Sequence, residues 1–271
     1  MFGNDFILDA KTIHKLSSVG VASNSLKQKL GTDLDFYLEL WRSQGLEIVK
    51  NGDYFYFSTK FTSIEDSVFC IVDIETNGSK IEKHQIIEIA ALKIKNMQII
   101  DRFESLVYCK EINEHITQIT GITAEDTKNA PNLKKVMYDF KAFLGDAVFV
   151  AHDVKFDYKF ISQSMQKIGL EPLLNRSLCT LSLAERTVES YRYALSYLNK
   201  FFSLHPDARH HRAMCDVLTT YELFKLSLSN IDNSVKSTED LIAFSKEAKR
   251  VKRPKFDPFI LESKEETLPK E

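Results

Sequence analysis

The sequence lacks the marks of a membrane protein, a secreted disulfide scaffold and a zinc-binding module. No apolar run in its 271 residues approaches the length of a membrane span, and its first residues lack a signal-peptide profile. The cysteines, Cys70, Cys109, Cys179 and Cys215, are far apart and form no C-x-x-C motif, so we expect reduced thiols. These absences predict a soluble protein in the cytoplasm.

A strong net charge and internal repeats are also missing. The formal net charge of −2 neither favours nor excludes an anionic partner, because a local basic surface can exist beneath a balanced total. Apolar residues make up 44% and charged residues 27% of the chain, which is typical of globular proteins with a sizeable core. The length suits one large domain or two modest ones.

The first part of the chain predicts a small winged-helix-like N-terminal domain over residues 1–64. Three short helical patterns are followed by two apolar runs, "LEIV" and "YFYF". The runs flank Asn51-Gly52, a strong signal for a tight hairpin. At the other end, residues 229–271 predict one helix with a capping box and then a tail. Its basic run at 249–255 is either a solvated tail or a contact for nucleic acid or a partner.

The central residues 65–228 predict a mixed α/β domain. The run "VFCIVDI" is followed by "HQIIEIAALKIK" and "QIIDRFESLVYC", with connections short enough for antiparallel neighbours. Helical patterns then alternate with one more strand, "AVFVA". This order predicts an α/β fold in which a mixed sheet is flanked by helices.

Acidic side chains gather in the patterns of this domain. Asp73 and Glu75 end the first strand and point to the same face, where two like charges about 4 Å apart cost roughly 4 kcal/mol at an effective dielectric near 20. Asp157 begins a helix just past a strand, and His211 precedes Asp216 by five residues. Clustered carboxylates are tolerable when divalent cations bind, and all-oxygen sites suit Mg²⁺ or Mn²⁺. Two such ions favour in-line phosphoryl displacement.

Three motifs in this order resemble those of the DEDDh (DnaQ-like) 3′–5′ exonucleases: D-x-E-T at 73–76, F-D-x-x-F at 156–160 and H-x4-D at 211–216. The stretches "ITGIT" and "CTLSLAER…YALSYLNKFF" also resemble that family. The likeness covers residues 68–228 and is greatest to the epsilon proofreading subunits of bacterial DNA polymerase III. It implies a ribonuclease-H-like fold.

The resemblance also implies roles for individual residues. Two Mg²⁺ or Mn²⁺ ions would be held by Asp73, Glu75, Asp157 and Asp216. His211 would be the general base, because an imidazole in water titrates near pH 6.5 and can take a proton near neutrality. The adjacent His210 is the rival base.

The 3′-terminal nucleotide would meet Thr76, His152 and Phe156, although core packing is an equal alternative for Phe156. Asp153 stands where the family usually carries Asn. Its charge either weakens substrate binding or shifts the metal preference, unless the side chain is turned away and hydrogen-bonded. Glu88 lies on the neighbouring strand, in a structural or a supporting role.

The implied activity is the removal of nucleoside 5′-monophosphates from a single-stranded or frayed DNA 3′ end, as the proofreading subunit of a polymerase. Two alternatives stay open: a free-standing exonuclease for DNA repair or RNA trimming, and a nucleic-acid-binding scaffold whose catalysis has lapsed.

Overall fold

The structure is a computed structural model and describes residues 8–206 and 211–259. Among these residues, no helix is both long and apolar enough to cross a membrane. All four cysteines are free thiols, as expected from their spacing. His210 and the final residues 260–271 lie outside the described part of the chain.

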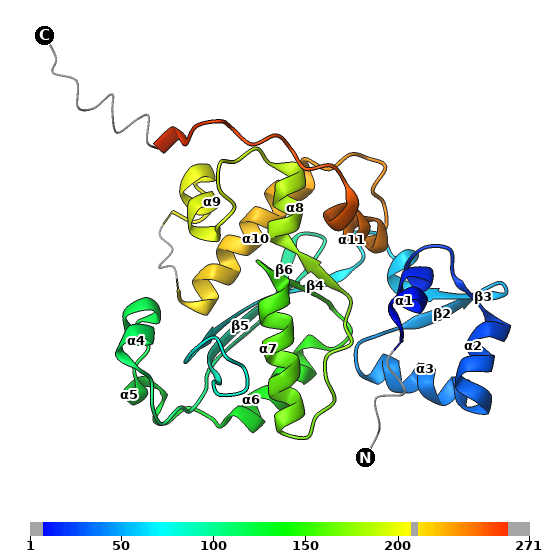
Figure 1. Ribbon diagram of the computed structural model, residues 1–271, viewed down its shortest axis with the longest axis horizontal. Coiled ribbons are helices and arrows are strands. Elements are labelled where there is room, and N and C mark those ends of the chain that lie inside the picture. Colours follow the sequence, from blue (N-terminus) through cyan, green and yellow to red (C-terminus); the bar gives the residue numbers. More distant parts are fainter. Residues whose placement is uncertain (1–7, 207–210, 260–271) are drawn as a thin grey trace, which may run out of the picture.

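The N-terminal residues form a small unit around their own core (Figure 1, blue). Its helices are α1 (Ala10–Ser17), α2 (Ser23–Leu30) and α3 (Leu34–Ser43). Its antiparallel sheet has the order β1-β3-β2, from β1 (Val21–Ala22), β2 (Ile48–Asn51) and β3 (Tyr54–Phe57). Trp41 is buried in this core, as its helical spacing with Leu34 and Leu38 requires.

The predicted hairpin is present, but its turn is shifted by one residue. Asn51 pairs with Tyr54, so the two loop residues are Gly52 and Asp53. Gly52 has φ +59° and Asp53 has no positive φ, which is the pattern of a type II′ turn with glycine at its first central position. Gly52 is therefore the residue that supplies the positive φ on which this turn depends.

The central sheet has five strands in the order β6-β5-β4-β7-β8. These are β4 (Val68–Thr76), β5 (Ile86–Lys95), β6 (Gln98–Leu106), β7 (Val148–Ala151) and β8 (Ser177–Cys179). β5 is antiparallel to β4 and β6, whereas β7 is parallel to both β4 and β8. The expectation of a mixed sheet is confirmed.

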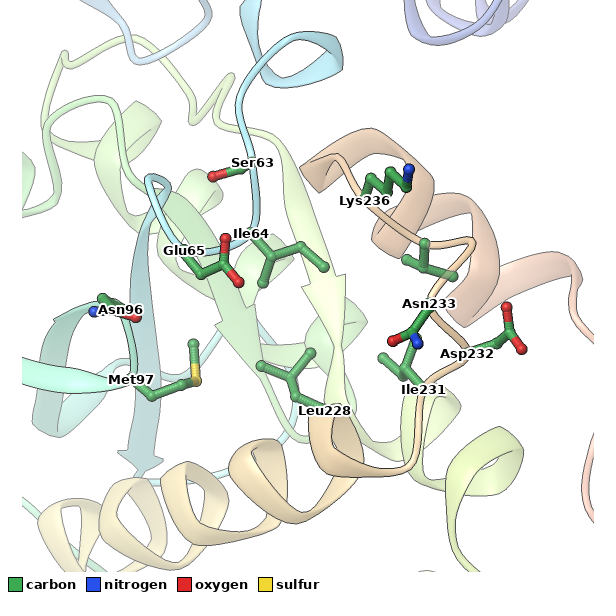
Figure 2. Close-up of a pocket in the computed structure, with 11 residues that line it drawn as sticks. Ser63, Ile64, Glu65, Asn96, Met97, Leu228, Ile231, Asp232, Asn233 and Lys236 are labelled. Atoms are coloured by element: carbon green, nitrogen blue, oxygen red, sulfur yellow. The ribbon is translucent and has the colours of Figure 1, made fainter.

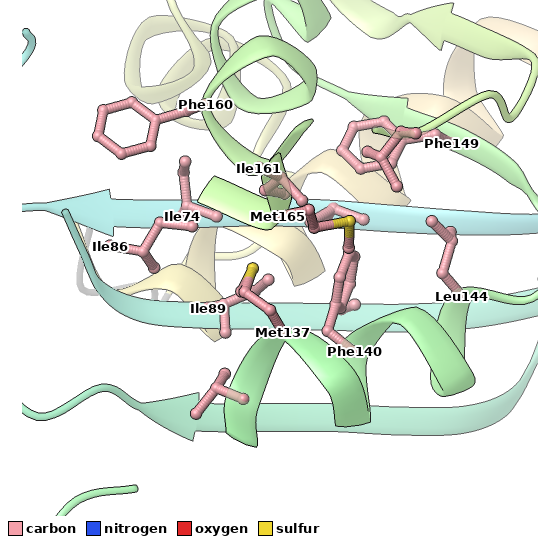
Figure 3. Close-up of a cluster of buried hydrophobic side chains, with 14 of the residues drawn as sticks. Ile74, Ile86, Ile89, Met137, Phe140, Leu144, Phe149, Phe160, Ile161 and Met165 are labelled. Carbon is pink, nitrogen blue, oxygen red and sulfur yellow. The ribbon is translucent and has the colours of Figure 1, made fainter. Parts of the chain in front are cut away.

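Helices cover both faces of this sheet (Figure 1). On one face, α6 (Leu133–Leu144) and α7 (Val154–Lys167) bury Met137, Phe140 and Phe160 against Ile74 and Ile89 (Figure 3). On the other face, Phe69 and Ile71 of β4 pack with α8 (Thr180–Thr187), α10 (Ala213–Ser229) and α11 (Thr238–Glu247). Three further helices, α4 (Glu114–Thr120), α5 (Ala124–Thr127) and α9 (Leu195–Phe202), lie outside these layers. Alternate residues of β4 thus face different helices.

The N-terminal unit contacts an ion pair that lies between the segment before β8 and helix α11. Arg176 donates from Nε and Nη2 to the Glu239 carboxylate at 2.6 and 2.7 Å, and its guanidinium lies 4.3 Å from the ring centre of Phe57. The Thr59 hydroxyl donates to the same carboxylate at 2.7 Å. Since Phe57 and Thr59 belong to the N-terminal unit, this cluster connects it to α11.

The C-terminal segment lies against α8. Ser237 and Asp240 form the predicted capping box at the start of α11. Two arginines of the basic run pair with the buried Glu185, Arg253 at 2.7 Å and Arg250 at 3.0 Å. These two arginines of the basic run therefore bind another part of the same chain, so the run is not simply a solvated tail.

Candidate active site

The predicted acidic residues come from three elements that meet at one edge of the sheet. β4 and β7 are parallel, so their carboxyl ends lie at the same edge. Asp73 and Glu75 end β4 on the face covered by α10, as the packing of Phe69 and Ile71 on that face requires. Asp157 lies in the first turn of α7, directly after β7, and Asp216 in the first turn of α10.

These carboxyl groups lie close together in a poorly solvated place, and this raises the pKa values of Asp73, Glu75 and Asp157. The pKa of Asp73 is raised well above its usual range by burial first, and then by the carboxylates of Asp157, Asp216, Glu75 and Glu88. Burial is also the largest cause for Glu75, whose pKa rises to about 8 with the help of the Asp216 charge. Burial raises the pKa of Asp157 to about 8, although backbone hydrogen bonds oppose the shift. The ionised cluster is thus unfavourable without a compensating charge.

The predicted base lies beside these acids. One ligand-type atom each of Glu75, His211 and Asp216 lies within 4.8 Å of the others. The backbone N–H of His211 donates to Asp216 Oδ2 at 2.9 Å. His211 itself precedes α10 and has φ +66°, a left-handed conformation that is uncommon for a residue with a side chain. His211 and Asp216 are therefore close together, as expected. The turn before α10 brings His211 beside Asp216, which lies in the first turn of the helix.

The three predicted nucleotide-contacting residues lie around the same edge. Thr76 follows Glu75 at a shift in the β4–β5 register, and its hydroxyl donates to the carbonyl of Gly78 at 3.0 Å. Such bulges are common next to active sites, where they redirect side chains. Phe156 on α7 is 38% exposed, and its ring lies 5.6 Å from that of Phe160, so one part of it packs and another part faces solvent.

His152 connects three segments. Its Nε2 contacts the carbonyl of Tyr193 at 2.8 Å, and its Nδ1 contacts the Thr180 hydroxyl at 3.1 Å. Because a carbonyl only accepts hydrogen bonds, Nε2 must carry a proton. Burial lowers the pKa of His152, which favours the neutral ring. Its nitrogens are thus occupied by the protein, and only its carbon edge is left for a ligand.

The backbone at position 153 suits Asp as well as the family's usual Asn. Asp153 precedes α7 with φ 65° and ψ 58°, and its side chain makes no capping hydrogen bond. Asn and Asp tolerate this left-handed conformation better than other residues with side chains. The Asp153 charge contributes to the raised pKa of Asp157, so its carboxylate acts on the site electrostatically.

One side chain at the site was missed in the sequence. Arg212 donates to the buried carboxylate of Glu88, at 2.9 Å from Nη2 and 3.2 Å from Nε. Its charge also lowers the pKa of Glu75, against the burial that raises it. Arg212 directly follows His211, but no spacing rule could find a partner that lies 124 positions away.

The donor set fits divalent cations. Clustered carboxylates beside one imidazole form the oxygen-rich environment that Mg²⁺ and Mn²⁺ prefer, and burial raises the pKa of Asp73, Glu75 and Asp157 within it. A separate pocket of about 550 Å³ lies between the Ser63–Glu65 segment, the β5–β6 turn and the end of α10 (Figure 2). None of its lining residues belongs to the acidic cluster, so this pocket is separate from the candidate catalytic residues.

Acidic residues at a sheet edge beside an imidazole are typical of enzymes that hydrolyse phosphodiesters with divalent cations. The comparisons with known proteins agree. A family model described as "Exonuclease" (RNase_T) matches residues 70–224, more than half of the chain. The chain belongs to the DEDDh (DnaQ-like) family of 3′–5′ exonucleases, which are divalent-metal-dependent hydrolases. The family expected from the three motifs is confirmed.

Similar curated proteins are PolC-type DNA polymerases III. The chain is 40% identical over 162 residues to that of Halalkalibacterium halodurans, covering 58% of this chain and 11% of the relative. It is 32% identical over 179 residues to that of Staphylococcus aureus, covering 65% of this chain and 12% of the relative. The chain therefore spans only about a tenth of the length of these relatives.

Solved structures show the same fold. Escherichia coli exonuclease I in complex with a dT13 oligonucleotide has a TM-score of 0.56 at 17% identity, covering 61% of this chain and 42% of that one. Exonuclease X in complex with 5′ overhanging duplex DNA has a TM-score of 0.50 at 23% identity, covering 64% of this chain and 99% of that one. These likenesses confirm the ribonuclease-H-like mixed sheet.

Proposed function

We propose that the protein is a metal-dependent 3′–5′ exonuclease that removes nucleoside 5′-monophosphates from DNA 3′ ends. The observation that carries the proposal is the acidic cluster, in which the pKa of Asp73 is raised by burial and by the carboxylates of Asp157, Asp216 and Glu75. Repulsive, desolvated carboxylates are costly to the fold. A function in cation binding explains why they are gathered there.

Asp73, Glu75, Asp157 and Asp216 would hold two Mg²⁺ or Mn²⁺ ions. When bound, these ions would supply positive charge for the scissile phosphate and its leaving oxygen. His211, beside Glu75 and Asp216, takes the proton of the attacking water. The water oxygen bonds to phosphorus, and the bond to the 3′-oxygen of the preceding nucleotide breaks. The product is a nucleoside 5′-monophosphate and a strand one residue shorter.

The terminal nucleotide would be positioned by Thr76, His152 and Phe156. The exposed part of the Phe156 ring offers a surface for base stacking, and the carbon edge of the neutral His152 lines the pocket. A nucleotide must leave the duplex to reach these side chains. Unpairing costs least at a mismatched end, which favours removal of errors.

For the cellular role we propose proofreading as a subunit associated with a replicative polymerase in the cytoplasm. The similarity to PolC-type polymerases supports this role. A second candidate is a free-standing exonuclease. It is favoured by the alignment with exonuclease X, because this chain covers 99% of that solved chain but only about a tenth of the PolC-type relatives. Co-purification of the full chain with a polymerase separates the two, since a free-standing enzyme shows no such association.

The domain division is part of the proposal: a winged-helix-like unit at 1–64, the exonuclease domain at 65–228 and a tail at 229–271. The order α1-β1-α2-α3-β2-β3 and the separate core support the first unit. Helix α3 exposes Phe36 between Asp35 and Glu39, which favours protein contact over DNA for this face. Unchanged DNA affinity after deletion of 1–64 would remove a DNA-gripping role.

The test of the activity is digestion of a 5′-labelled single-stranded DNA with Mg²⁺ or Mn²⁺. We expect stepwise shortening from the 3′ end by the native protein and none by Asp73→Ala. The matched control is Asp101→Ala, which removes an exposed carboxylate of β6 and should leave the ladder unchanged. Equal activity of Asp73→Ala and the native protein would refute the site assignment, and an RNA strand of the same sequence tests the choice of nucleic acid.

A further inference from the structure

Glu88 is a buried carboxylate that the proposed reaction does not use. It is 1% exposed and lies on β5, directly opposite Glu75 in the β4–β5 register. Ala90 and Leu92, two and four positions further on, pack in the cluster that includes α10, so Glu88 points toward α10 as well. Two acids opposite each other on one face repel. The position of Glu88 therefore needs a compensating group.

The compensating groups come from the start of α10. The Glu88 carboxylate accepts hydrogen bonds from Arg212 Nη2 at 2.9 Å and Nε at 3.2 Å, and from the backbone N–H of Ala213 at 2.9 Å. Arg212 is the residue that precedes α10, and its own side chain does not cap the helix. Glu88 thus caps α10 from another element, where a negative charge is also favoured by the helix dipole.

This cap holds the segment that carries the proposed base. His211 comes directly before Arg212, and its left-handed backbone, φ +66°, is an unfavourable conformation that persists only where the surroundings hold it. On one side the His211 N–H is bonded to Asp216, and on the other side Arg212 and Ala213 are bonded to Glu88. The turn is therefore fixed at both ends by carboxylates.

We infer that Glu88 and Arg212 are positioning residues of the active site. Their pair fixes the start of α10, so that the imidazole of His211 and the carboxylate of Asp216 keep their places beside Glu75. The inference rests on the proposed function for the reaction that the site catalyses. The positions of His211 and Asp216 relative to Glu75 do not depend on that proposal.

The chain contains a matched control for this pair. Arg176 and Glu239 also form a two-point ion pair, at 2.6 and 2.7 Å, and Glu239 is 3% exposed. This second pair joins the N-terminal unit to α11 and contacts none of the residues of the acidic cluster. Glu88→Gln and Glu239→Gln therefore make the same chemical change at similar burial, one beside the site and one away from it.

The experiment compares native protein, Glu88→Gln, Arg212→Lys and Glu239→Gln. Four quantities are measured: kcat and KM on a single-stranded oligonucleotide, the Kd of Mn²⁺ by calorimetry, and the unfolding temperature. Loss of a residue that orients metal ligands typically costs about 10–100-fold in affinity or activity. We expect Glu88→Gln to lower kcat and weaken Mn²⁺ binding by about that range, with KM nearly unchanged. Arg212→Lys should be intermediate, because lysine keeps the charge and loses the two-point geometry.

Glu239→Gln should lower the unfolding temperature at least as much as Glu88→Gln, yet leave kcat and the Mn²⁺ affinity near native values. When Glu88→Gln and Arg212→Lys are combined in one chain, their effects on kcat should not be additive, since both act on the same pair. Equal effects of Glu88→Gln and Glu239→Gln on kcat and on Mn²⁺ affinity would overturn the inference. Absence of nuclease activity in the native protein would instead refute the proposed function, while the Mn²⁺ affinities would still test the positioning role.

Discussion

Replacement of Glu75 by glutamine should stabilise the metal-free protein at alkaline pH while it destroys the site. Burial and the Asp216 charge raise the pKa of Glu75 from 4.5 to about 8. A carboxyl with a higher pKa in the folded state binds its proton more tightly there than in the unfolded chain. The free energy of unfolding must therefore fall as the pH rises from about 4.5 to about 8.

The size of the effect follows from the same pKa. One pKa unit corresponds to about 1.4 kcal/mol, so the ionised Glu75 costs the fold roughly 4 kcal/mol near pH 8. Glutamine keeps the shape and loses the charge, but it is still a buried polar group. We therefore expect about half of this cost to be regained, and about 2 kcal/mol raises the unfolding temperature of a chain of this size by roughly 4–8 °C.

The assay is thermal unfolding in EDTA at pH 5 and at pH 8, then at pH 8 with Mn²⁺. Glu75→Gln should unfold at a higher temperature than native protein at pH 8 and at a similar temperature at pH 5. Mn²⁺ should stabilise the native protein more than the variant, because the variant has lost a ligand. Glu239→Gln is the control, and its loss of a buried ion pair should destabilise at both pH values. A variant that is no more stable than the native protein at pH 8 without metal would refute the electrostatic reasoning.

Three further predictions follow from the described contacts. His211→Gln should lower the rate of 3′ shortening by about 10²–10⁴-fold, the usual contribution of a general base; a native-like rate would assign the proton transfer to another group. Asp153→Asn should keep the left-handed turn and remove an anion near Asp157, so KM for an oligonucleotide should fall; a higher KM would contradict this. Arg176→Ala should cost about 3–5 kcal/mol in urea unfolding, because Glu239 is left buried and unpaired; a loss below 1 kcal/mol would show that water reaches Glu239.

The sequence predicted the elements that carry strong local signals. The run at 68–74 is β4, the helix expected at "NLKKVMYDFKAFLG" is α6, and the capping box at Ser237 begins α11. The strands it missed are short: β1 has two residues and β8 has three. Such strands exist because neighbouring strands pair with them, and no period can be read from two or three residues. The helices α5 and α8 were not predicted either.

The predicted acids and His211 lie together, because motifs of adjacent elements converge at one sheet edge. Their roles stay predictions. What could not be predicted depends on contacts between distant segments. The left-handed backbone of His211 has no local signature, and the bond between Arg212 and Glu88 joins positions 124 apart. The occupied nitrogens of His152 likewise depend on Thr180 and Tyr193, which only the folded chain brings near.

The cluster of Arg176, Glu239 and Phe57 has a mechanical consequence. One guanidinium contacts a ring of the N-terminal unit and a carboxylate of α11 at once. These contacts therefore oppose rotation of the N-terminal unit relative to α11. A partner bound to the N-terminal unit would then be held in a restricted range of positions relative to the acidic cluster.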